Sequence, residues 1–230
     1  IDGKIDVDGR LDEPAWGRAL LLFLAVETEP GENIPASLRT EVRVFYGKDA
    51  VYFGLECFDP QPQQIRARFA ERDSFDADDL ININLDTFND ERRNYFLGCN
   101  PLGVQRDGIE TLGGDGSWDG IWDSAGRIHE QGYTIEIAIP FSTLQFQRSA
   151  GPQVWGLDIS RWYPRSQRHR LGLVRIDRSN NSYQSQFMKI RGFAGITPGR
   201  NIEVVPTLTG INTDARADLP DGEFANASRK

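Results

Sequence analysis

The strand-like segment Leu80–Asp86 carries two asparagines, Asn82 and Asn84, that period-two alternation places on one face. Asparagine disfavours strands, so a pair of them on one face needs an explanation. Their amide groups offer hydrogen-bond donors and an acceptor at a fixed geometry, which suits the hydroxyl groups of a sugar. The segment therefore indicates either a sugar-binding sheet face or a solvated face without a ligand.

A second segment, residues 113–123, combines glycines and aspartates with two tryptophans, Trp118 and Trp122. Sugar rings stack their C–H faces on flat aromatic rings, while neighbouring polar groups bind the hydroxyls. The two tryptophans are therefore candidate sugar platforms. The alternative is that they close one end of the hydrophobic core, and we expect Trp118, beside its glycines, to be the more exposed of the two.

The aspartates of the same segment, Asp115, Asp119 and Asp123, offer hard oxygen ligands of the kind that Ca²⁺ prefers. They recur at every fourth residue, which does not match the EF-hand pattern. A calcium site formed by these three residues, or by the aspartates of the loop Asp73–Asp79, is kept as a hypothesis, and calcium is the cofactor that these loops suggest.

Catalysis has no positive signal in this sequence. The two histidines, His129 and His169, are isolated, and neither a G-x-S-x-G nor an H-E-x-x-H motif is present. Acidic residues are plentiful between Glu71 and Asp90, but nothing selects the pair of carboxylates that a glycosidase needs. Met188, which could be considered as a haem ligand, lies in an apolar strand. We therefore expect a protein that is not an enzyme.

The net charge of −8 argues against nucleic acid or an anionic membrane as the partner, because both repel an acidic protein. Four arginines between Arg161 and Arg170 interrupt this acidic character, and we expect them to lie on a solvated strand edge or loop. No apolar run approaches the ~20 residues of a membrane-spanning helix. No signal peptide is present, and the abrupt start on Ile1 leads us to expect a mature or trimmed chain.

Alternating hydrophobicity dominates the chain and helical periodicity is scarce. Turn residues separate the alternating segments. We predict strands over Thr40–Tyr46, Val51–Phe58, Leu80–Asp86, Asn94–Cys99, Tyr133–Ile139, Val154–Trp162, Gln184–Arg191 and Asn201–Thr209. About ten strands of this kind predict an all-β fold, a two-sheet antiparallel β-sandwich of jelly-roll type with short helical turns at Asp12–Trp16 and Pro140–Leu144.

Two cysteines, Cys57 and Cys99, lie inside predicted strands, and their spacing excludes a C-x-x-C motif. A disulfide between neighbouring strands is one interpretation, and two buried free thiols is the one that we favour. We predict one sandwich domain over residues 1–197. Residues 198–230, which offer little to bury, are predicted to be a linker or the start of a following β-barrel domain.

The order of several motifs resembles family 9 carbohydrate-binding modules. The opening Val7–Trp16 is similar to that family's "DG-x-LDE-x-x-W", and Asp78–Asp86 to its "DD-x-[VI]-x-[IV]-x-[LF]-D" strand. Gly132–Phe141 matches its "G-[YW]-T-x-E-[IV]-A-IP" strand and turn, and Thr40–Gly54 resembles the hairpin between them. The resemblance spans roughly residues 1–195.

A narrower group of relatives is similar in three further segments: Asn100–Gln105, Trp118–Asp123 and Pro140–Phe146. These relatives are uncharacterised domains that precede outer-membrane β-barrels in Gram-negative bacteria, where a segment like Pro198–Pro206 leads into the barrel. The resemblance implies a fragment of a larger protein in the cell envelope, in the periplasm or at the outer membrane and cell surface. Its own C-terminal β-barrel would then be a partner.

The resemblance also implies a site. Sugar-binding members hold the end of a sugar chain between two aromatic side chains, above polar strand residues. Phe75 and Asp76 stand where the family places its first aromatic, Asn82 where it places an acid, and Tyr183 or Phe187 supplies the second aromatic.

The implied function is non-catalytic binding of a glycan by a secreted or envelope protein that captures or imports polysaccharide. Two alternatives remain open at this point. One is a structural plug or docking domain for the β-barrel, and the other is a sandwich that binds haem or a metal.

Overall fold

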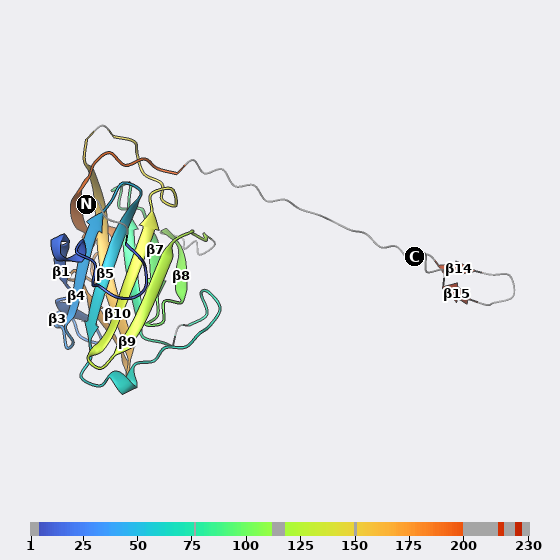
Figure 1. Cartoon of the computed structure of the whole chain (residues 1–230), viewed down its shortest axis with the longest axis horizontal. Coiled ribbons are helices and arrows are strands. Elements are labelled where there is room, and N and C mark those ends of the chain that lie inside the picture. The colour runs from blue at the N-terminus through green and yellow to red at the C-terminus, as the bar shows by residue number, and fades with distance from the viewer. Residues whose placement is uncertain are drawn as a thin grey trace. The chain divides into compact units, whose positions relative to one another are not determined.

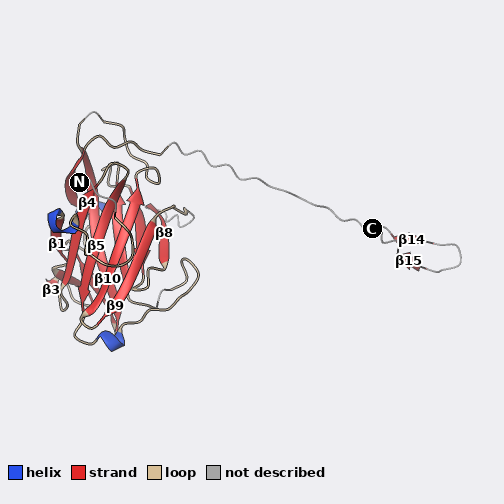
Figure 2. Cartoon of the chain, in the orientation of Figure 1, coloured by secondary structure: helices blue, strands red, loops and turns tan. Residues whose placement is uncertain are grey.

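A computed structural model describes residues 5–75, 77–111, 118–149 and 151–199, with the backbone of residues 216–218 and 224–226. The chain divides into two compact units, Ile1–Gly199 and Arg200–Lys230. The first unit is built from two antiparallel sheets (Figure 1), and helix is confined in the described part to three-residue 3-10 turns (Figure 2). The predicted all-β, two-sheet antiparallel sandwich is confirmed.

The first sheet, which faces the viewer in Figure 1, has five strands in the order β1-β4-β5-β10-β9. Their bounds are Leu20–Phe23 for β1, Thr40–Tyr46 for β4, Ala50–Phe58 for β5, Gly132–Pro140 for β10 and Asp123–His129 for β9. In β10, Tyr133, Ile135, Ile137 and Ile139 are at most 1% exposed, as their alternation predicts for a core face.

The second sheet has eight strands in the order β3-β2-β12-β11-β6-β7-β8, with β13 also paired to β11. Their bounds are Ile34–Pro35 for β3, Val26–Glu29 for β2, Arg168–Gly172 for β12, Gln153–Pro164 for β11, Leu80–Asp86 for β6, Arg93–Cys99 for β7, Gln105–Thr111 for β8 and Met188–Phe193 for β13. Side chains from the inner faces of both sheets, such as Phe53, Ile83 and Trp155, form one continuous hydrophobic core.

The outer face of the five-stranded sheet is covered by the N-terminal segment, which the Glu136 carboxylate holds in place. This buried side chain on β10 accepts hydrogen bonds from the backbone N–H groups of Asp8 and Gly9 and from Trp16 Nε1. Burial raises the pKa of Glu136, and the backbone hydrogen bonds act in the opposite direction. The opening motif therefore has a structural role: its glycine and tryptophan bind one carboxylate of the sheet.

Arg161 is buried and the Arg165 side chain is only 14% exposed, so the prediction of a solvated edge is wrong for both. Arg161 faces the core, where it donates to Thr40 Oγ1 at 3.1 Å and to the Phe58 carbonyl at 2.9 Å. Arg165 contacts the carboxylates of Asp59 at 2.5 Å and Asp79 at 3.1 Å. Because a buried guanidinium needs partners, these contacts are what permits the two arginines inside the fold.

Both cysteines are buried free thiols, and burial raises the pKa of Cys57 to about 11 and that of Cys99 further. The first predicted helical turn is a 3-10 turn, η1 (Trp16–Arg18), while residues 141–144 form only a turn. Within the described residues, no helix has the length and apolar composition that crossing a bilayer requires.

In the second unit, β14 (Arg216–Asp218) pairs antiparallel with β15 (Phe224–Asn226). The predicted strand Asn201–Thr209 lies outside the described residues.

Candidate functional site

A groove of about 480 Å³ lies over the outer face of the eight-stranded sheet, the face turned away from the core. Strands β6, β7, β8, β11 and β12 line it, together with Tyr183 from the loop between β12 and β13. Its lining residues are Asn82, Asn84, Phe96, Arg106, Ile109, Glu110, Ser160, Trp162, Arg170 and Tyr183. The predicted Asn82, Asn84 and Tyr183 are thus brought together.

The floor of the groove is a row of small and polar residues across neighbouring strands. In the strand register, Ser160 of β11 lies opposite Asn82 of β6, which lies opposite Gly98 of β7. A Cβ atom on Gly98 would lie 2.4 Å from Asn82 Oδ1 and 2.6 Å from the Ile81 carbonyl oxygen, so only glycine fits there. The floor is therefore kept close to the backbone, which leaves room above it.

Asn82 is only partly buried, but its Oδ1 atom is shielded from solvent and has no hydrogen-bond partner among the described residues. A buried acceptor without a donor costs on the order of 1–3 kcal/mol unless water or a ligand satisfies it. The Nε–H donor of Arg170, a second lining residue, is also buried and has no hydrogen-bond partner among the described residues. The groove thus contains hydrogen-bonding capacity that the described residues do not use.

One wall of the groove is fixed by a network around the buried carboxylate of Asp158. The Tyr183 hydroxyl donates to Asp158 Oδ2 at 2.5 Å, and Arg170 Nη2 donates to the Tyr183 oxygen at 2.6 Å and to Asp158 Oδ2 at 3.3 Å. Burial raises the pKa of Asp158, while the Arg170 charge and the Tyr183 hydroxyl act in the opposite direction. Burial also raises the pKa of Tyr183. The network ties the loop to the sheet.

A chain of side-chain amides supports the same loop. Asn84 Nδ2 donates to the Tyr183 oxygen at 3.4 Å, and Asn94 Nδ2 donates to Asn84 Oδ1 at 3.0 Å. Gln184, the first residue of the 3-10 turn η3 (Gln184–Gln186), donates from Nε2 to Asn94 Oδ1 at 3.1 Å. Asn84 therefore positions Tyr183, whereas the side chain of Asn82 lines the groove and its Oδ1 makes no hydrogen bond to a described residue.

Trp162 and Phe96 are aromatic lining residues that the sequence did not reveal, and Trp162 is the one that lies beside the arginines. It lies opposite Arg170 in the pairing of β11 with β12 and is half-buried. The guanidinium carbons of Arg168 and Arg170 lie 4.4 Å and 5.5 Å from the centre of its ring. The alternation of residues along β11 could have placed Trp162 on the outer face of the sheet. Trp162 shares that face with Ser160, while Ile159 and Arg161 face the core.

Three predicted sugar-binding aromatics are buried instead, and their prediction as exposed ring platforms is wrong. Phe75 is 1% exposed, and Trp122 and Phe187 are each 4% exposed. Phe187 packs edge-on against the ring of Tyr183, with 4.9 Å between ring centres, and so supports the groove from below. Asp76, predicted beside Phe75, lies outside the described residues.

Trp118 is half-buried and packs on the core, with its ring 4.8 Å from that of Tyr95. It is more exposed than Trp122, as we expected, but it does not line the groove. Trp122 donates from Nε1 to Asp107 Oδ2 at 3.0 Å. The two tryptophans therefore belong to the packing beside β8, and Trp162 takes the position that we had assigned to them.

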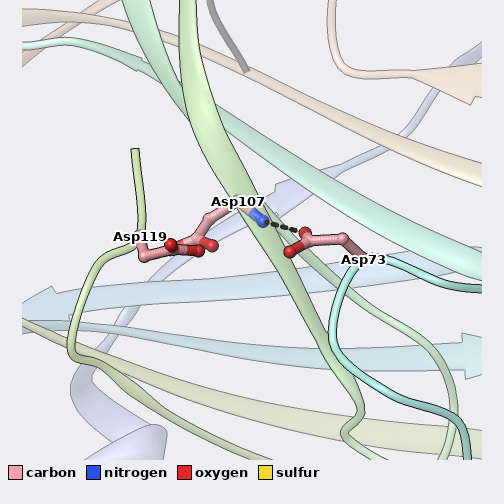
Figure 3. A group of neighbouring side chains, drawn as sticks. All are labelled: Asp73, Asp107 and Asp119. Carbon is pink, nitrogen blue, oxygen red and sulfur yellow. Dashed lines mark hydrogen bonds between the residues drawn. The ribbon is translucent and has the colours of Figure 1, made fainter. Parts of the chain in front are cut away.

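Of the three calcium ligands predicted within residues 113–123, the one that falls in a group of described acidic residues is Asp119, and that group does not include Asp123. Asp123 is exposed and Asp115 lies outside the described residues, while Asp119 lies with Asp73 and Asp107, with one carboxylate oxygen of each within 4.8 Å of the others (Figure 3). The Asp73 carboxylate in this group accepts the backbone N–H of Asp107 at 3.1 Å.

The grouped aspartates do not fit a calcium ion. Asp107 is the buried member, and Arg72 donates to its Oδ1 at 3.0 Å and to its Oδ2 at 2.5 Å. The Gly120 N–H and Trp122 Nε1 donate to the same Oδ2. A cation would have to displace the Arg72 guanidinium, which already neutralises this carboxylate.

Comparison with known proteins supplies a family and a fold. The family model described as carbohydrate family 9 binding domain-like matches residues 7–186 of the chain. No curated protein sequence matches the chain significantly.

Solved structures of similar shape share little sequence identity with the chain. A family 9 carbohydrate-binding module from Caldicellulosiruptor kristjanssonii in complex with cellotriose aligns with a TM-score of 0.60 and 15% identity, over 90% of this chain and 96% of that one. A family 9 module from the same organism in complex with glucose aligns with a TM-score of 0.60 and 16% identity, over 89% of this chain and 96% of that one. A candidate carbohydrate-binding protein from Bacteroides uniformis aligns with a TM-score of 0.61 and 9% identity, over 76% of this chain and 87% of that one. These likenesses establish a shared fold.

Proposed function

The chain belongs to the carbohydrate family 9 binding domain-like family, and on that premise we propose that it binds carbohydrate, without catalysis, in the groove over the eight-stranded sheet. The observation that carries the proposal is the row Ser160, Asn82 and Gly98, a polar floor at backbone level beside the ring of Trp162. A sugar ring needs an open floor, hydroxyl partners and an aromatic neighbour, and this groove supplies all three.

The charges in the groove support binding without chemistry. Hydrolysis of a glycosidic bond needs two carboxyl groups facing each other across the bond. Among the described lining residues, Glu110 carries the one carboxylate, and the nearby Asp158 is buried and paired with Arg170 and Tyr183. The described lining of the groove therefore holds one half-buried acid where a glycosidase would use two.

We extend the proposal to the cell envelope of a Gram-negative bacterium, where the domain would capture polysaccharide for a C-terminal β-barrel of the same protein. The support is the similarity of Asn100–Gln105 and Pro198–Pro206 to envelope relatives of that organisation. Fractionation of the native organism with an antibody to this domain tests the location, and recovery in the cytoplasmic fraction would contradict it.

Docking onto that barrel is a second candidate function, and one observation favours it. Strand β1 is an edge strand of the five-stranded sheet, and Leu20, Leu21 and Phe23 on it are 53%, 44% and 47% exposed. Apolar side chains on an unpaired sheet edge invite another strand or surface. If docking is the main function, Leu21→Glu abolishes association with the barrel, and no glycan binds the isolated chain.

A glycan array followed by titration calorimetry tests the carbohydrate proposal, with Trp162→Ala and Trp118→Ala as a matched pair. Stacking contributes on the order of 1–3 kcal/mol, so loss of Trp162 is expected to weaken binding roughly tenfold to a hundredfold. Trp118→Ala, outside the groove, is expected to leave the affinity unchanged. A chain that binds no glycan, or one in which Trp118→Ala alone abolishes binding, would contradict the proposal.

A further inference from the structure

The groove is the site of a local excess of positive charge on an acidic protein. The chain carries 26 lysines and arginines against 34 aspartates and glutamates. At the groove, however, Arg106 and Arg170 line the walls and Arg168 lies over Trp162. Among the described residues, the nearby acids are Glu110 on the wall, Asp158 paired with Arg170, and Glu29 opposite Arg170 in the pairing of β12 with β2. The described lining residues alone carry two cations, Arg106 and Arg170, against one anion, Glu110, whereas acids outnumber bases in the chain as a whole.

Two guanidinium groups lie close to the ring of Trp162, one of three aromatic side chains that line the groove. Arg168 and Arg170 both approach the Trp162 ring, with Arg168 the closer of the two. A neutral sugar that stacked on this ring would have to compete with these cations. A sugar that carries an acidic group gains a partner instead, because a guanidinium binds carboxylates and sulfate esters through paired hydrogen bonds.

The two charged ends of the groove are separated by the width of several strands. Arg170 lies on β12 and Arg106 on β8, with β11, β6 and β7 between them in the sheet order. Four strand spacings of about 4.8 Å place their backbones roughly 19 Å apart, and both side chains line the groove between them. One acidic monosaccharide cannot reach both ends, whereas an oligosaccharide with several acidic units can.

We propose that the groove selects anionic oligosaccharides, whose carboxylate or sulfate groups pair with Arg106 at one end and with Arg168 and Arg170 at the other. The uncharged part of the sugar lies over Asn82 and Ser160. This inference rests on the proposed carbohydrate binding and names its substrate class. The Arg170–Asp158–Tyr183 network holds Arg170 at the groove wall, while Arg168 is exposed and free to follow the ligand.

Three probes separate the ligand chemistries: trigalacturonic acid for carboxylates, a carrageenan tetrasaccharide for sulfate esters, and cellotriose as the neutral sugar. Titration calorimetry with the full chain at low salt is expected to show at least tenfold tighter binding of one or both acidic probes than of cellotriose. Because the attraction is electrostatic and partly exposed, raising the salt to about 0.5 M is expected to remove most of that preference.

Matched variants locate the charge that matters. Arg168→Gln removes an exposed cation whose one described side-chain contact is the Trp162 ring, so the fold is expected to be unaffected. It is expected to weaken acidic-probe binding about tenfold, the equivalent of about 1.4 kcal/mol, without changing cellotriose binding. Arg127→Gln on β9, an exposed arginine of the other sheet, is the control and is expected to bind all probes like the wild type.

The outcomes are distinct. Preference for an acidic probe that falls in Arg168→Gln but not in Arg127→Gln supports the inference, and the tighter acidic probe identifies the anionic group. Equal or tighter binding of cellotriose overturns the inference and leaves carbohydrate binding intact. No binding of any probe, on a broad array as well, overturns both. An equal loss in both arginine variants indicates a non-specific charge effect and overturns the inference alone.

Discussion

Gly98 lies directly opposite Asn82 in the pairing of β7 with β6, and the Asn82 amide occupies the space that a side chain at position 98 would need. The absence of a side chain at position 98 thus has two consequences. It allows the two strands to approach, and it keeps the floor of the groove low enough for a ligand to reach Asn82.

Replacement of Gly98 by alanine is expected to lower the free energy of unfolding by about 1–3 kcal/mol, because its Cβ atom would meet the Ile81 carbonyl at 2.6 Å. Urea denaturation measures this loss. Gly17→Ala is the matched control, since nothing lies within 4 Å of its Cβ position, and its stability is expected to change by less than about 0.5 kcal/mol. Equal stability of both variants would contradict the close approach.

The two asparagines of β6 are expected to behave differently. Asn84→Ala removes the hydrogen bonds that join Asn84 to Asn94 and to Tyr183, and is expected to cost about 1–3 kcal/mol of stability. Asn82→Ala removes a buried acceptor that has no partner among the described residues, so stability is expected to stay the same or to rise by up to about 1–3 kcal/mol while glycan affinity falls. Parallel urea denaturation and titration calorimetry measure both effects. Loss of stability in Asn82→Ala without loss of affinity would refute the distinction.

The pKa of Asp158 predicts a pH dependence of stability. Burial raises this pKa above its ordinary value of 3.8, so the folded protein binds the proton more readily than the unfolded chain does. The stability that this group contributes is therefore fully present below pH 3.8 and is lost as the pH rises through the raised pKa. The stability of the wild type minus that of Asp158→Asn is expected to decrease over this range.

Asp177→Asn provides a control of opposite sign. Hydrogen bonds from the Ser179 side chain and backbone lower the pKa of the exposed Asp177, so its contribution is present above pH 3.8 and is lost as the pH falls. Urea denaturation of the three proteins between about pH 3 and pH 7 tests both directions. A wild-type advantage over Asp158→Asn that grows with pH would show that the Arg170 contact outweighs burial.

Chelation is expected to leave the melting temperature unchanged at low salt. Both oxygens of Asp107 already accept hydrogen bonds from Arg72, so the aspartate group needs no cation to offset its charge. A required ion would stabilise the fold by mass action, and its removal would then lower the melting temperature. Differential scanning calorimetry with EDTA, and with added CaCl₂ as the reverse test, measures this. A fall of several degrees with EDTA would restore the calcium hypothesis.

Much of the fold could be predicted because burial alternates locally along a strand. The segments Thr40–Tyr46 and Leu80–Asp86 are strands with the predicted bounds. The strand predicted from Gln184 instead begins at Met188, because the Gln184 amide is needed by Asn94 on β7. That contact joins residues 90 positions apart, and no local pattern could reveal it.

The candidate site was predictable only in part. Asn82 stood out because asparagine is unusual in a strand, and it lines the groove. Trp162 and Arg170 were missed because their proximity depends on the register between β11 and β12. Phe75 and Trp122 were misassigned because the sequence does not show which loop aromatics fold back into the core. Side chains that form a site across strands therefore needed the structure.

The most direct test of the account is an NMR titration of the ¹⁵N-labelled chain with the tightest-binding oligosaccharide from the array. The account predicts that the largest shift changes fall on the Asn82 side-chain amide, the Trp162 indole N–H and the backbone amide of Gly98. The indole signals of Trp118 and Trp122 should stay in place. Changes centred on those two tryptophans, with the Asn82 and Trp162 signals unmoved, would contradict the assignment of the groove as the binding site.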